Sequence, residues 1–560
     1  MAPLELSRRE LFSTFLGAGA AAALGACRGS APGPTFSGEI VGANASFGHL
    51  LRDGGGRLEP GQPPARVGVA IVGGGVAGLS AAWCLARAGV EDFRIYELEE
   101  EAGGTARAGQ NAVSRYPWGA HYLPVPLPHA RAAIALLAEM GVARALPDGS
   151  VEYEETQLCR APQERLFIAD RFYEGLWPGP IATEEDRRQV AVFDAEVKRW
   201  AELKDGQGRR AFAVPCAYGS GDADVAALDR ISMADWLAER KLGSPRLRWF
   251  LEYACRDDFG ARLPETSAWA GLHYFASRVE GGKSAELLTW PEGNGRLVAH
   301  LARSAKGRVV PGAGAVEVRP SAQGVELRYL VPRRGRVESV IADQVILALP
   351  RAFASRLLAS ERDRPPPFVE RFQVGSWLVA NLTLKGRPRE RGFPLAWDNV
   401  LYGSESLGYV VATHQTDPGA CLEREGEACA RRAPEAGRSV WTWYLPMTDA
   451  DPKAGRAKLL GLDWRQAAEL CVADLTRAHP DIARWIERLD VMRWGHAMIR
   501  PAPGFAFGPW RKEAARPQGS VFFAHSDLSG LALFEEAQYQ GVRAAEEVLA
   551  ARRIRFESLL

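Results

Sequence analysis

A glycine-rich turn between a predicted strand and a predicted helix is the feature that most constrains this chain. Residues 66–72 are a short apolar run rich in β-branched residues, which predicts a buried parallel strand, and residues 79–88 contain helix formers. The turn between them has the pattern G-x-G-x-x-G. Gly73 allows the tight turn, Gly75 the approach of a diphosphate to the backbone, and Gly78 close packing of helix on strand. This arrangement predicts a dinucleotide-binding unit, in which the helix N-terminus faces the phosphates.

An acidic residue at the end of the next predicted strand strengthens this interpretation. Residues 93–97 form a second short apolar strand that ends in Glu97, 19 residues after Gly78. A carboxylate in this position accepts the ribose hydroxyls of an adenosine. The glycine pattern alone is also consistent with a tight turn in a doubly wound fold, but strand, helix and carboxylate in register favour a dinucleotide.

Four further segments resemble, in their order along the chain, the superfamily of flavin amine oxidases, phytoene desaturases and protoporphyrinogen oxidases. They are the glycine pair in residues 101–107, the turn and helix start in 290–297, the strands in 308–318 and 343–350, and the strand, acid and helix start in 519–545. The resemblance implies a bound FAD. No cysteine lies in 525–540 for a thioether to the flavin, so the FAD is expected to be non-covalent.

The resemblance also assigns the cofactor contacts. Asp527 would meet the ribityl or diphosphate portion, the backbone at Val316 would bracket the adenine, and the backbone of residues 534–537 would lie near the pyrimidine end of the ring. With the glycine turn, the expected cofactor-binding residues are Gly73, Gly75, Ala77, Gly78, Glu97, Gly103, Gly104, Thr105, Val316, Asp527, Glu535 and Ala537.

The order of the segments implies an α/β fold with interleaved domains. The expected architecture is an FAD-binding Rossmann domain of the glutathione-reductase type, with an α+β substrate domain inserted into it. The FAD-binding domain would comprise residues 65–125, 286–350 and 493–555, and the substrate domain a mostly helical part, 126–285, and a β-rich part, 351–492.

Residues on the substrate side are less sharply indicated. Oxidation by a flavin needs an apolar, aromatic pocket at the ring, and the pocket candidates are Trp118, Tyr122, Trp290, Asp257 and Asp258, the two acids as ligands of a cationic amine. Each aromatic residue is equally explained by core packing, and the acids by a solvated helix end. The catalytic candidates are His121, His496 and Lys283; amine oxidases of this superfamily use a lysine near the flavin.

One departure weakens the amine interpretation. Leu533 stands where amine oxidases often place a tyrosine beside the flavin, so half of the usual aromatic cage is missing unless Trp118, Tyr122 or Trp290 rebuilds it. Three hypotheses therefore stay open: an enzyme that oxidises an amine or polyamine, similar to bacterial spermidine dehydrogenases; a desaturase or porphyrinogen-type oxidase acting on an apolar substrate; and an FAD-stabilised binding protein without turnover. The absence of a second Rossmann fingerprint favours a small-molecule electron donor, with oxygen or a membrane component as the electron acceptor.

The N-terminus is expected to be an export signal. Arg8 and Arg9 precede an uncharged run, residues 11–26, that is shorter than the roughly 20 residues needed to span a bilayer. The arginine pair resembles the bacterial twin-arginine signal, and the residues ending at Cys27 resemble a lipobox. This predicts a lipid-anchored protein of the periplasm or cell envelope, exported in folded form; an uncleaved anchor or a chance small-residue tail is the alternative. Residues 28–64, rich in glycine and proline, are expected to be a linker, either a tether or an arm that lies along the surface.

Composition excludes some other classes. A net charge of +1 argues against nucleic-acid binding, and membrane contact is expected only through the anchor at Cys27. Eight cysteines in 560 residues are too few for a disulfide scaffold, although Cys421 and Cys429 could pair in an oxidising compartment. No spacing typical of a zinc site occurs, so no metal is expected.

Overall fold

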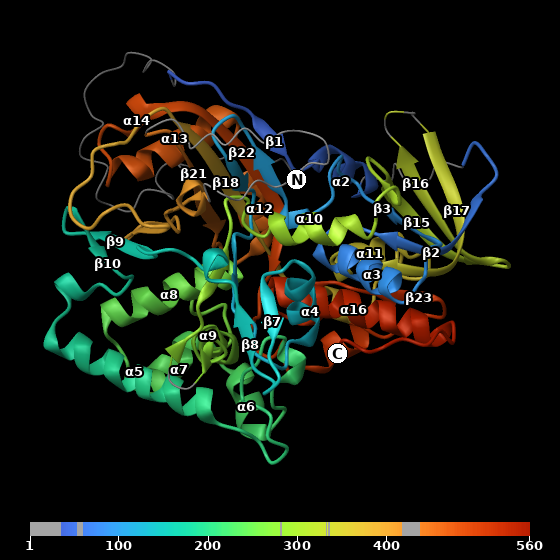
Figure 1. The fold of residues 1–560 in the computed structure, drawn as a ribbon, viewed down its shortest axis with the longest axis horizontal. Helices are drawn as coiled ribbons and strands as arrows, with labels where there is room; N and C mark the ends of the chain where they lie inside the picture. The colour runs from blue at the N-terminus through green and yellow to red at the C-terminus, as the bar shows by residue number, and fades with distance from the viewer. Residues whose placement is uncertain (1–34, 53–59, 281–282, 332, 334–335, 417–436) are drawn as a thin grey trace, which may run out of the picture.

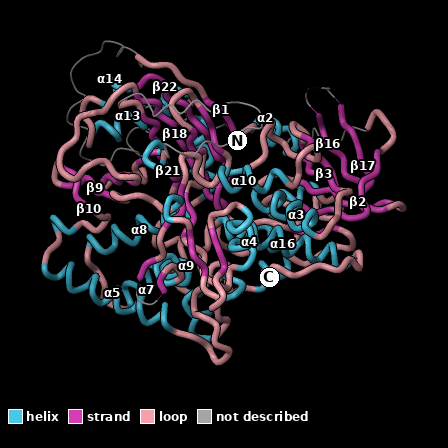
Figure 2. The backbone as a smooth tube through the Cα atoms, viewed as in Figure 1, coloured by secondary structure: helices cyan, strands magenta, loops and turns pink. Residues whose placement is uncertain are grey.

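Two large sheets and a helical lobe make up the molecule (Figures 1 and 2). The computed structural model describes residues 35–560, apart from 53–59, 281–282, 332, 334–335 and 417–436. The expected signal, with Cys27, and the cysteines at 421 and 429 therefore lie outside the described residues. The described cysteines, Cys84, Cys159, Cys216, Cys255 and Cys471, are all free thiols.

The first sheet has seven strands and holds the glycine turn. Its order is β14-β3-β2-β17-β16-β15, with β23 beside β17. β14, β3, β2, β17 and β23 run parallel, whereas β15, β16 and β17 form an antiparallel meander. Parallel strands that are covered on both faces are formed by continuous apolar runs, because both sets of side chains are buried. The last six residues of β2 are accordingly all buried. The bounds are β2 Ala65–Val72, β3 Phe93–Tyr96, β14 Val309–Val310, β15 Gly314–Ser321, β16 Gly324–Val331, β17 Arg336–Leu347 and β23 Val521–Phe523.

Three helices that come from distant parts of the sequence pack together beside this sheet. They are α3 (Val76–Arg87), α10 (Gly295–Arg303) and α16 (Phe534–Ala551), and α3 contacts both of the others. The crossing of α16 over α3 requires a glycine: a Cβ on Gly541 would lie 2.1 Å from the carbonyl oxygen of Ala77. All three segments expected to form the FAD-binding domain supply strands to this sheet, β2 and β3 from the first, β14–β17 from the second and β23 from the third.

The second sheet has eight strands, in the order β1-β22-β18-β21-β20-β19-β9-β10. Every residue of β18 is buried, which shows that this sheet is covered on both faces. Helices α12 (Pro452–Gly461) and α13 (Trp464–Thr476) pack in the apolar cluster on one side, and an aromatic cluster lies on the other. The bounds are β1 Ile40–Gly42, β9 Glu164–Ile168, β10 Arg171–Glu174, β18 Val374–Leu384, β19 Asp398–Leu401, β20 Tyr409–Val411, β21 Ser439–Met447 and β22 Ile486–Ile499.

The helical lobe lies below the second sheet in Figure 1 and has its own apolar core. Capping boxes begin two of its helices: Thr183 with Asp186 at α5, and Ser232 with Asp235 at α7. Its helices are α5 Glu184–Glu202, α6 Ala223–Ala227, α7 Met233–Glu239, α8 Pro245–Phe259 and α9 Ala268–Ala276. The remaining elements are α2 Ala45–Arg52, β4 Ala108–Gln110, β5 Arg115–Pro117, β6 Tyr122–Pro124, α4 Arg131–Glu139, β7 Ala143–Ala145, β8 Val151–Tyr153, β11 Val279–Glu280, β12 Lys283–Ser284, β13 Leu287–Thr289, α11 Arg351–Leu357, α14 Ile482–Trp485 and α15 Pro509–Ala514.

Two details differ from the sequence-based expectation. The expected linker, residues 28–64, contains β1 and α2, because backbone pairing with β22 and an apolar contact of Phe47 order its described part. The second sheet also takes β9 and β10 from the part expected to be mostly helical, and β22 begins at Ile486, before the expected boundary at 493.

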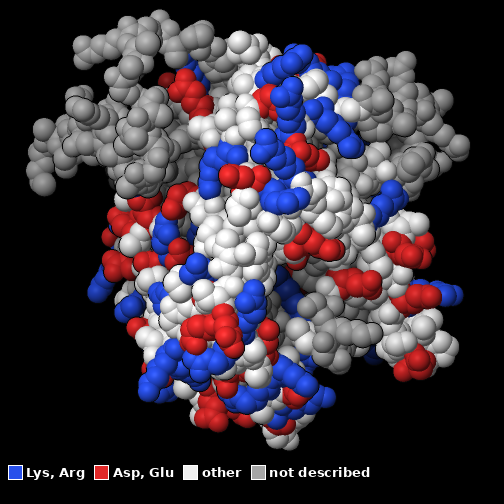
Figure 3. Space-filling view, turned by 90° about the vertical axis from the view of Figure 1, so that its left-hand side faces the viewer, with Lys and Arg blue, Asp and Glu red and all other residues white. Residues whose placement is uncertain are grey.

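The surface agrees with a chain of nearly balanced charge. On the face shown in Figure 3, basic and acidic side chains are interspersed. Among the described residues, no helix combines the length and apolarity that crossing a membrane would require.

Candidate functional site

The glycine turn has the close contacts that its pattern predicts. Gly73 has a φ of +100°, and a Cβ there would lie 2.5 Å from the carbonyl oxygen of Ala348 on the neighbouring strand end. A Cβ on Gly78 would lie 1.9 Å from the Gly73 carbonyl oxygen. The strand can therefore turn directly into α3 only with glycine at both positions. The helix begins after Gly75, so its first N–H groups point out of the turn.

A second glycine loop lies against the first. The N–H of Gly103 donates to the Gly74 carbonyl oxygen at 2.8 Å, and both Gly103 and Gly104 have positive φ values. A Cβ on Gly104 would lie 3.3 Å from the Cα of Gly75, so side chains here would fill the space between the loops. Thr105 follows, and its carbonyl oxygen accepts the N–H of Ala120 at 3.0 Å. The two loops form a cradle without side chains, as close approach of a diphosphate requires.

Glu97 directly follows β3, next to this cradle. Its Oε2 accepts the N–H of Gly74 at 2.6 Å and its Oε1 accepts the N–H of Glu99 at 2.8 Å. Burial raises its pKa, while these two hydrogen bonds lower it. Each oxygen keeps a further lone pair for a hydroxyl group, so the carboxylate is placed for the predicted ribose contact.

Several buried side-chain oxygens in the predicted FAD segments have no hydrogen-bond donor among the described residues, and two of them lie next to predicted cofactor contacts. One is Oδ1 of Asp527, whose Oδ2 accepts the N–H of Arg351 at 2.7 Å. Nδ1 of His525 lies 3.1 Å from this oxygen and 3.3 Å from the backbone nitrogen of Asp527, whose N–H it accepts. The other is Oδ1 of Asn294, in the turn before α10. Buried acceptors of this kind call for a ligand with hydroxyl groups, and the residues present fit FAD.

Three of the residues expected to contact the cofactor, Val316, Ala537 and Glu535, also take part in contacts within the chain. Val316 lies at a β-bulge in β15, and its carbonyl oxygen accepts from Arg362 Nη2 at 3.2 Å. Ala537 donates its N–H to the Leu533 carbonyl oxygen, so this N–H is not left for a cofactor. Glu535 presents its side chain, and not only its backbone, to the site.

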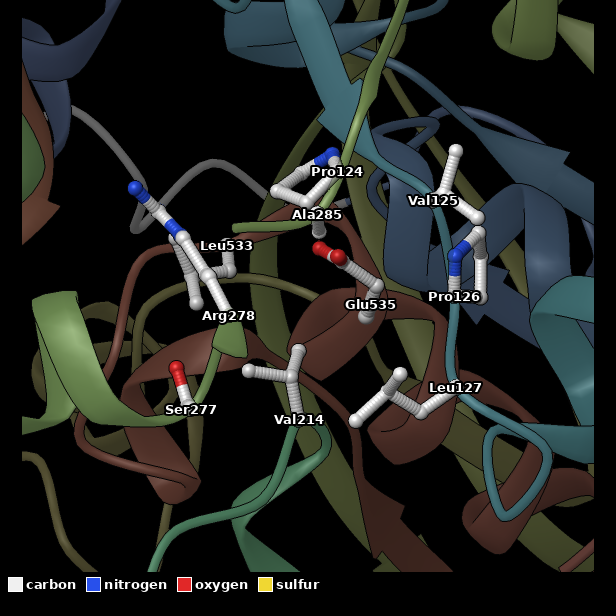
Figure 4. A pocket seen from close by; sticks show the side chains of 10 residues that line it. All are labelled: Pro124, Val125, Pro126, Leu127, Val214, Ser277, Arg278, Ala285, Leu533 and Glu535. Carbon is white, nitrogen blue, oxygen red and sulfur yellow. The ribbon is translucent and has the colours of Figure 1, made fainter. Parts of the chain in front are cut away.

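The Glu535 side chain projects into a small pocket between the segment after β6, the end of α9 and the start of α16 (Figure 4). The walls are Pro124, Val125, Pro126, Leu127, Val214, Ser277, Arg278, Ala285 and Leu533. Burial raises the pKa of Glu535 to about 7, an effect opposed by the charge of Arg278. The pocket thus joins the C-terminal FAD segment to the helical lobe.

Asp257 and Asp258, at the end of α8, have different environments. Asp258 is buried and accepts a hydrogen bond from Arg278 Nη2 at 2.8 Å, so it is already neutralised by a cation. Asp257 is half-buried, and no hydrogen-bond or ion-pair partner for it occurs among the described residues. Burial, and then the charge of Asp258, raise the pKa of Asp257 to about 7.

Asp398 lies close to Asp257 on one side and to Glu164 on the other, and the sequence analysis identified neither Asp398 nor Glu164. Asp398 begins β19 and accepts a hydrogen bond from the Tyr253 hydroxyl at 3.4 Å. Its pKa is well above the usual range because of burial and because of the charges of Asp257 and Glu164. Glu164 keeps access to the surface, yet enough of the chain surrounds its carboxylate to raise its pKa. The three acids come from α8, β9 and β19, too far apart in sequence to form a motif.

Aromatic rings surround these acids. His121 stacks on Tyr444 with ring centres 4.9 Å apart, and Tyr122 packs edge-on against Trp397 at 6.0 Å. The Tyr444 hydroxyl donates to the Gly119 carbonyl oxygen at 3.0 Å. Burial lowers the pKa of His121 to about 4, so its ring is neutral. We call the whole group the acid–aromatic cluster: Glu164, Asp257, Asp398, His121, Tyr122, Tyr253, Tyr274, Trp397 and Tyr444.

The remaining predicted residues have different surroundings. Trp118 lies in the same buried aromatic core as Tyr253, Trp397 and Tyr444, packs edge-on against Tyr116, and accepts the Trp494 indole N–H with its carbonyl oxygen. Trp290 belongs to the core of the first sheet, with its indole N–H bonded to Gln157, so it does not line the acid–aromatic cluster. His496 is exposed on β22 and packs against Phe353. The backbone of Lys283 lies in the short strand β12, but its side chain is outside the described part.

Comparison with known proteins agrees with this geometry. The sequence profile of the flavin-containing amine oxidoreductases matches residues 76–549. No curated protein sequence matches the chain significantly.

Three solved structures illustrate the similarity of fold. Putrescine oxidase bound to putrescine is 16% identical, with a TM-score of 0.59, and covers 87% of this chain and 100% of its own. Cyclohexylamine oxidase from Brevibacterium oxydans is 15% identical, with a TM-score of 0.58 and the same coverage. A CLA-producing fatty acid isomerase from P. acnes is 13% identical, with a TM-score of 0.56, and covers 87% of this chain and 98% of its own.

These identities are low enough that the structures establish the fold alone, and they confirm the predicted α/β fold with a Rossmann-type FAD-binding domain. The family match extends over most of the chain and confirms FAD as the cofactor. The chain belongs to the flavin-containing amine oxidoreductase family and is an FAD-dependent oxidoreductase.

Proposed function

We propose that this oxidoreductase is exported and oxidises an amine or polyamine whose cationic groups bind at the acid–aromatic cluster. The observation that carries the proposal is the proximity of Asp257, Asp398 and Glu164, each with a raised pKa. Arg278 lies nearby but is paired with Asp258. An ammonium group bound at Asp398, between the half-buried Asp257 and the exposed Glu164, would supply a countercharge to carboxylates that are partly removed from water.

The aromatic members of the cluster suit the same ligand. A cation over the face of a Tyr or Trp ring gains about 0.5–2 kcal/mol, most when it is removed from water. Trp397 and Tyr444 supply such rings, with one face of Tyr444 covered by His121, while Arg278 already lies over the Tyr122 ring at 5.8 Å. His121, with a pKa of about 4, adds no positive charge that would repel a cation.

FAD, when bound, supplies the oxidant that accepts a hydride from the carbon next to the amine nitrogen. The residues of this chain hold the substrate: the acids fix the charged nitrogen, and the aromatic side chains enclose the carbon chain. Arg278 connects the two parts of the site, because it lines the pocket at Glu535 and also lies 3.4 Å from the Tyr122 hydroxyl.

The amine hypothesis is better supported than that of an apolar substrate. A polyene or porphyrinogen would leave the three acids without a countercharge, at a cost in binding free energy. Putrescine oxidase bound to putrescine and cyclohexylamine oxidase, which share this fold, are named for amine substrates.

The test is anaerobic reduction of the bound flavin, followed by the loss of its visible absorbance. Putrescine, spermidine, cyclohexylamine, a porphyrinogen and a polyene would be offered to the purified holoenzyme. We expect bleaching by the amines and its weakening in Asp398→Asn, with Glu174→Gln, an exposed acid on β10, as the control. Bleaching only by the porphyrinogen or the polyene, or by none of the compounds, would reject the amine proposal.

Export and anchoring are the part of the proposal that depends on residues 1–27 alone. The arginine pair at 8 and 9 and the lipobox-like sequence before Cys27 support an exported, lipid-anchored protein of the cell envelope. We expect Arg8→Lys with Arg9→Lys to retain the protein in the cytoplasm, and Cys27→Ala to move it from the membrane fraction to the soluble one. The electron acceptor, oxygen or a membrane component, would be identified by oxygen uptake with and without added quinone.

A further inference from the structure

An N-terminal arm, residues 37–47, crosses from the second sheet to the edge of the FAD-binding domain. Its first part is held by backbone pairing: Leu489 donates its N–H to the Ser37 carbonyl oxygen at 2.9 Å, and Val491 to that of Glu39 at 2.9 Å. Glu39 also pairs with Arg488 at 2.5 Å. These contacts extend the edge of the second sheet by β1.

The middle of the arm lies on the second glycine loop. A Cβ on Gly42 would lie 3.3 Å from Nη2 of Arg107, the last residue of the glycine-pair segment 101–107. Asn44 donates its backbone N–H to Oε1 of Glu99 at 2.8 Å, and Oε2 of Glu99 lies 3.7 Å from Nη1 of Arg107. The arm is therefore joined to the two segments that hold Glu97 and the glycine pair.

The end of the arm is anchored by Phe47, which is only 5% exposed. Its ring packs among Val316, Leu330 and Val337, with Leu98 beside them. The ring fits because residue 314 is glycine: a Cβ there would lie 2.0 Å from Cζ of Phe47. An apolar anchor in a fitted socket indicates a specific contact, because a side chain that merely lay on the surface would not need a glycine opposite it.

The position of this anchor relates it to one end of the cofactor. Leu98 follows Glu97, which is placed for the ribose of the adenosine, and Val316 is the residue expected at the adenine. We propose that residues 37–47 form a clasp that retains the adenosine half of FAD, with Phe47 as its anchor. The proposal requires only that the chain binds FAD, as its family does, and not that its substrate is an amine. Its test is therefore independent of the proposed function.

The experiment compares two cofactors that differ only in the adenosine half. Apoprotein of the full chain, wild type and Phe47→Ala, is titrated with FAD and with FMN, which has the same ring and ribityl phosphate but no adenosine. We expect Phe47→Ala to raise the Kd for FAD about tenfold, equivalent to about 1.4 kcal/mol, and to leave the Kd for FMN unchanged. Release of FAD from diluted holoenzyme, followed by the rise in flavin fluorescence, should accelerate by a similar factor.

A second variant tests the socket with Phe47 intact. Gly314→Ala should expel the ring and speed FAD release, and Phe47→Ala with Gly314→Ala should be no faster than Phe47→Ala alone, since both remove the same contact. Val41→Ala, on the same arm with its side chain 40% exposed, is the control and should release FAD at the wild-type rate. Equal losses of FAD and FMN affinity, no change in either, or additive effects of the two substitutions would overturn the clasp. If Phe47→Ala does not fold, Gly314→Ala provides the same FAD and FMN comparison.

Discussion

Replacing Asp257 by asparagine removes one charge from the acid–aromatic cluster and keeps the shape of the side chain. The structure shows no partner for this carboxylate among the described residues, so the substitution should break no existing hydrogen bond. A hydrogen bond to a charged group is worth about 1.5–3 kcal/mol. We therefore expect Asp257→Asn to weaken the binding of a cation by about 10- to 150-fold at a pH where the aspartate is ionised.

The pH dependence follows from the raised pKa of Asp257, about 7. The carboxyl group is neutral below this pH and negative above it, so wild-type affinity for a cation should rise from pH 6 to pH 8. The folded pKa lies above the usual value of 3.8 for an aspartate, so ionising the group costs folding stability as the pH rises to 7. Asp257→Asn should remove the contribution of this group to both effects: its cation affinity should rise less with pH than that of wild type, because Asp398 and Glu164 remain, and it should be at least as stable as wild type at pH 8.

The assay uses a bis-quaternary alkyl diammonium ion, which keeps its charge at every pH and lacks the nitrogen lone pair that oxidation requires. Its Kd is measured from the change in the flavin spectrum between pH 6 and pH 9, with Glu174→Gln as a control acid outside the cluster. Flavin content and unfolding curves verify that the variant is intact. Equal affinity and equal pH dependence in wild type and Asp257→Asn would refute the assignment of this acid as a cation ligand.

Three further predictions concern the cofactor and the internal ion pair. Gly78→Ala places a Cβ 1.9 Å from the Gly73 carbonyl oxygen, so the purified protein should lack flavin absorbance while a surface glycine variant such as Gly61→Ala keeps it. Asp527→Leu removes Oδ1, a buried acceptor that has no donor within the described chain, so FAD should be lost on dialysis. Retention of FAD at the wild-type level would contradict the predicted contact between Asp527 and the ribityl portion. Arg278→Gln leaves Asp258 buried without its cation, so the free energy of unfolding should fall by about 3–5 kcal/mol and recover in part when Asp258→Asn is added, as measured by urea denaturation.

The FAD-binding part of the molecule could be read from the sequence because its information is local. A turn in which a Cβ would lie 2.5 Å from a neighbouring carbonyl oxygen admits only glycine, and this restriction falls on residues a few positions apart. The same holds for Glu97, whose position is fixed by the end of β3. Such restrictions produce a sequence motif that can be recognised without knowledge of the rest of the fold.

The substrate side depended on contacts that no local pattern records. Asp257 and Asp258 are adjacent in the sequence, but the fold pairs one with Arg278 and turns the other toward Asp398. Trp290 was expected in the substrate pocket, but the fold places it in the core of the first sheet. An aromatic or acidic side chain has the same sequence signature in a core, on a surface or in a site, and only its neighbours distinguish these roles.

By itself the sequence determined the glycine turn, the carboxylate after β3 and hence a nucleotide cofactor, because backbone sterics act between consecutive residues. Only the tertiary structure decided which acids share one environment and where the N-terminal arm rests. The reason is physical: the pKa of a carboxylate and the burial of Phe47 are set by groups brought from more than a hundred residues away, and chain folding, not chain order, determines those distances.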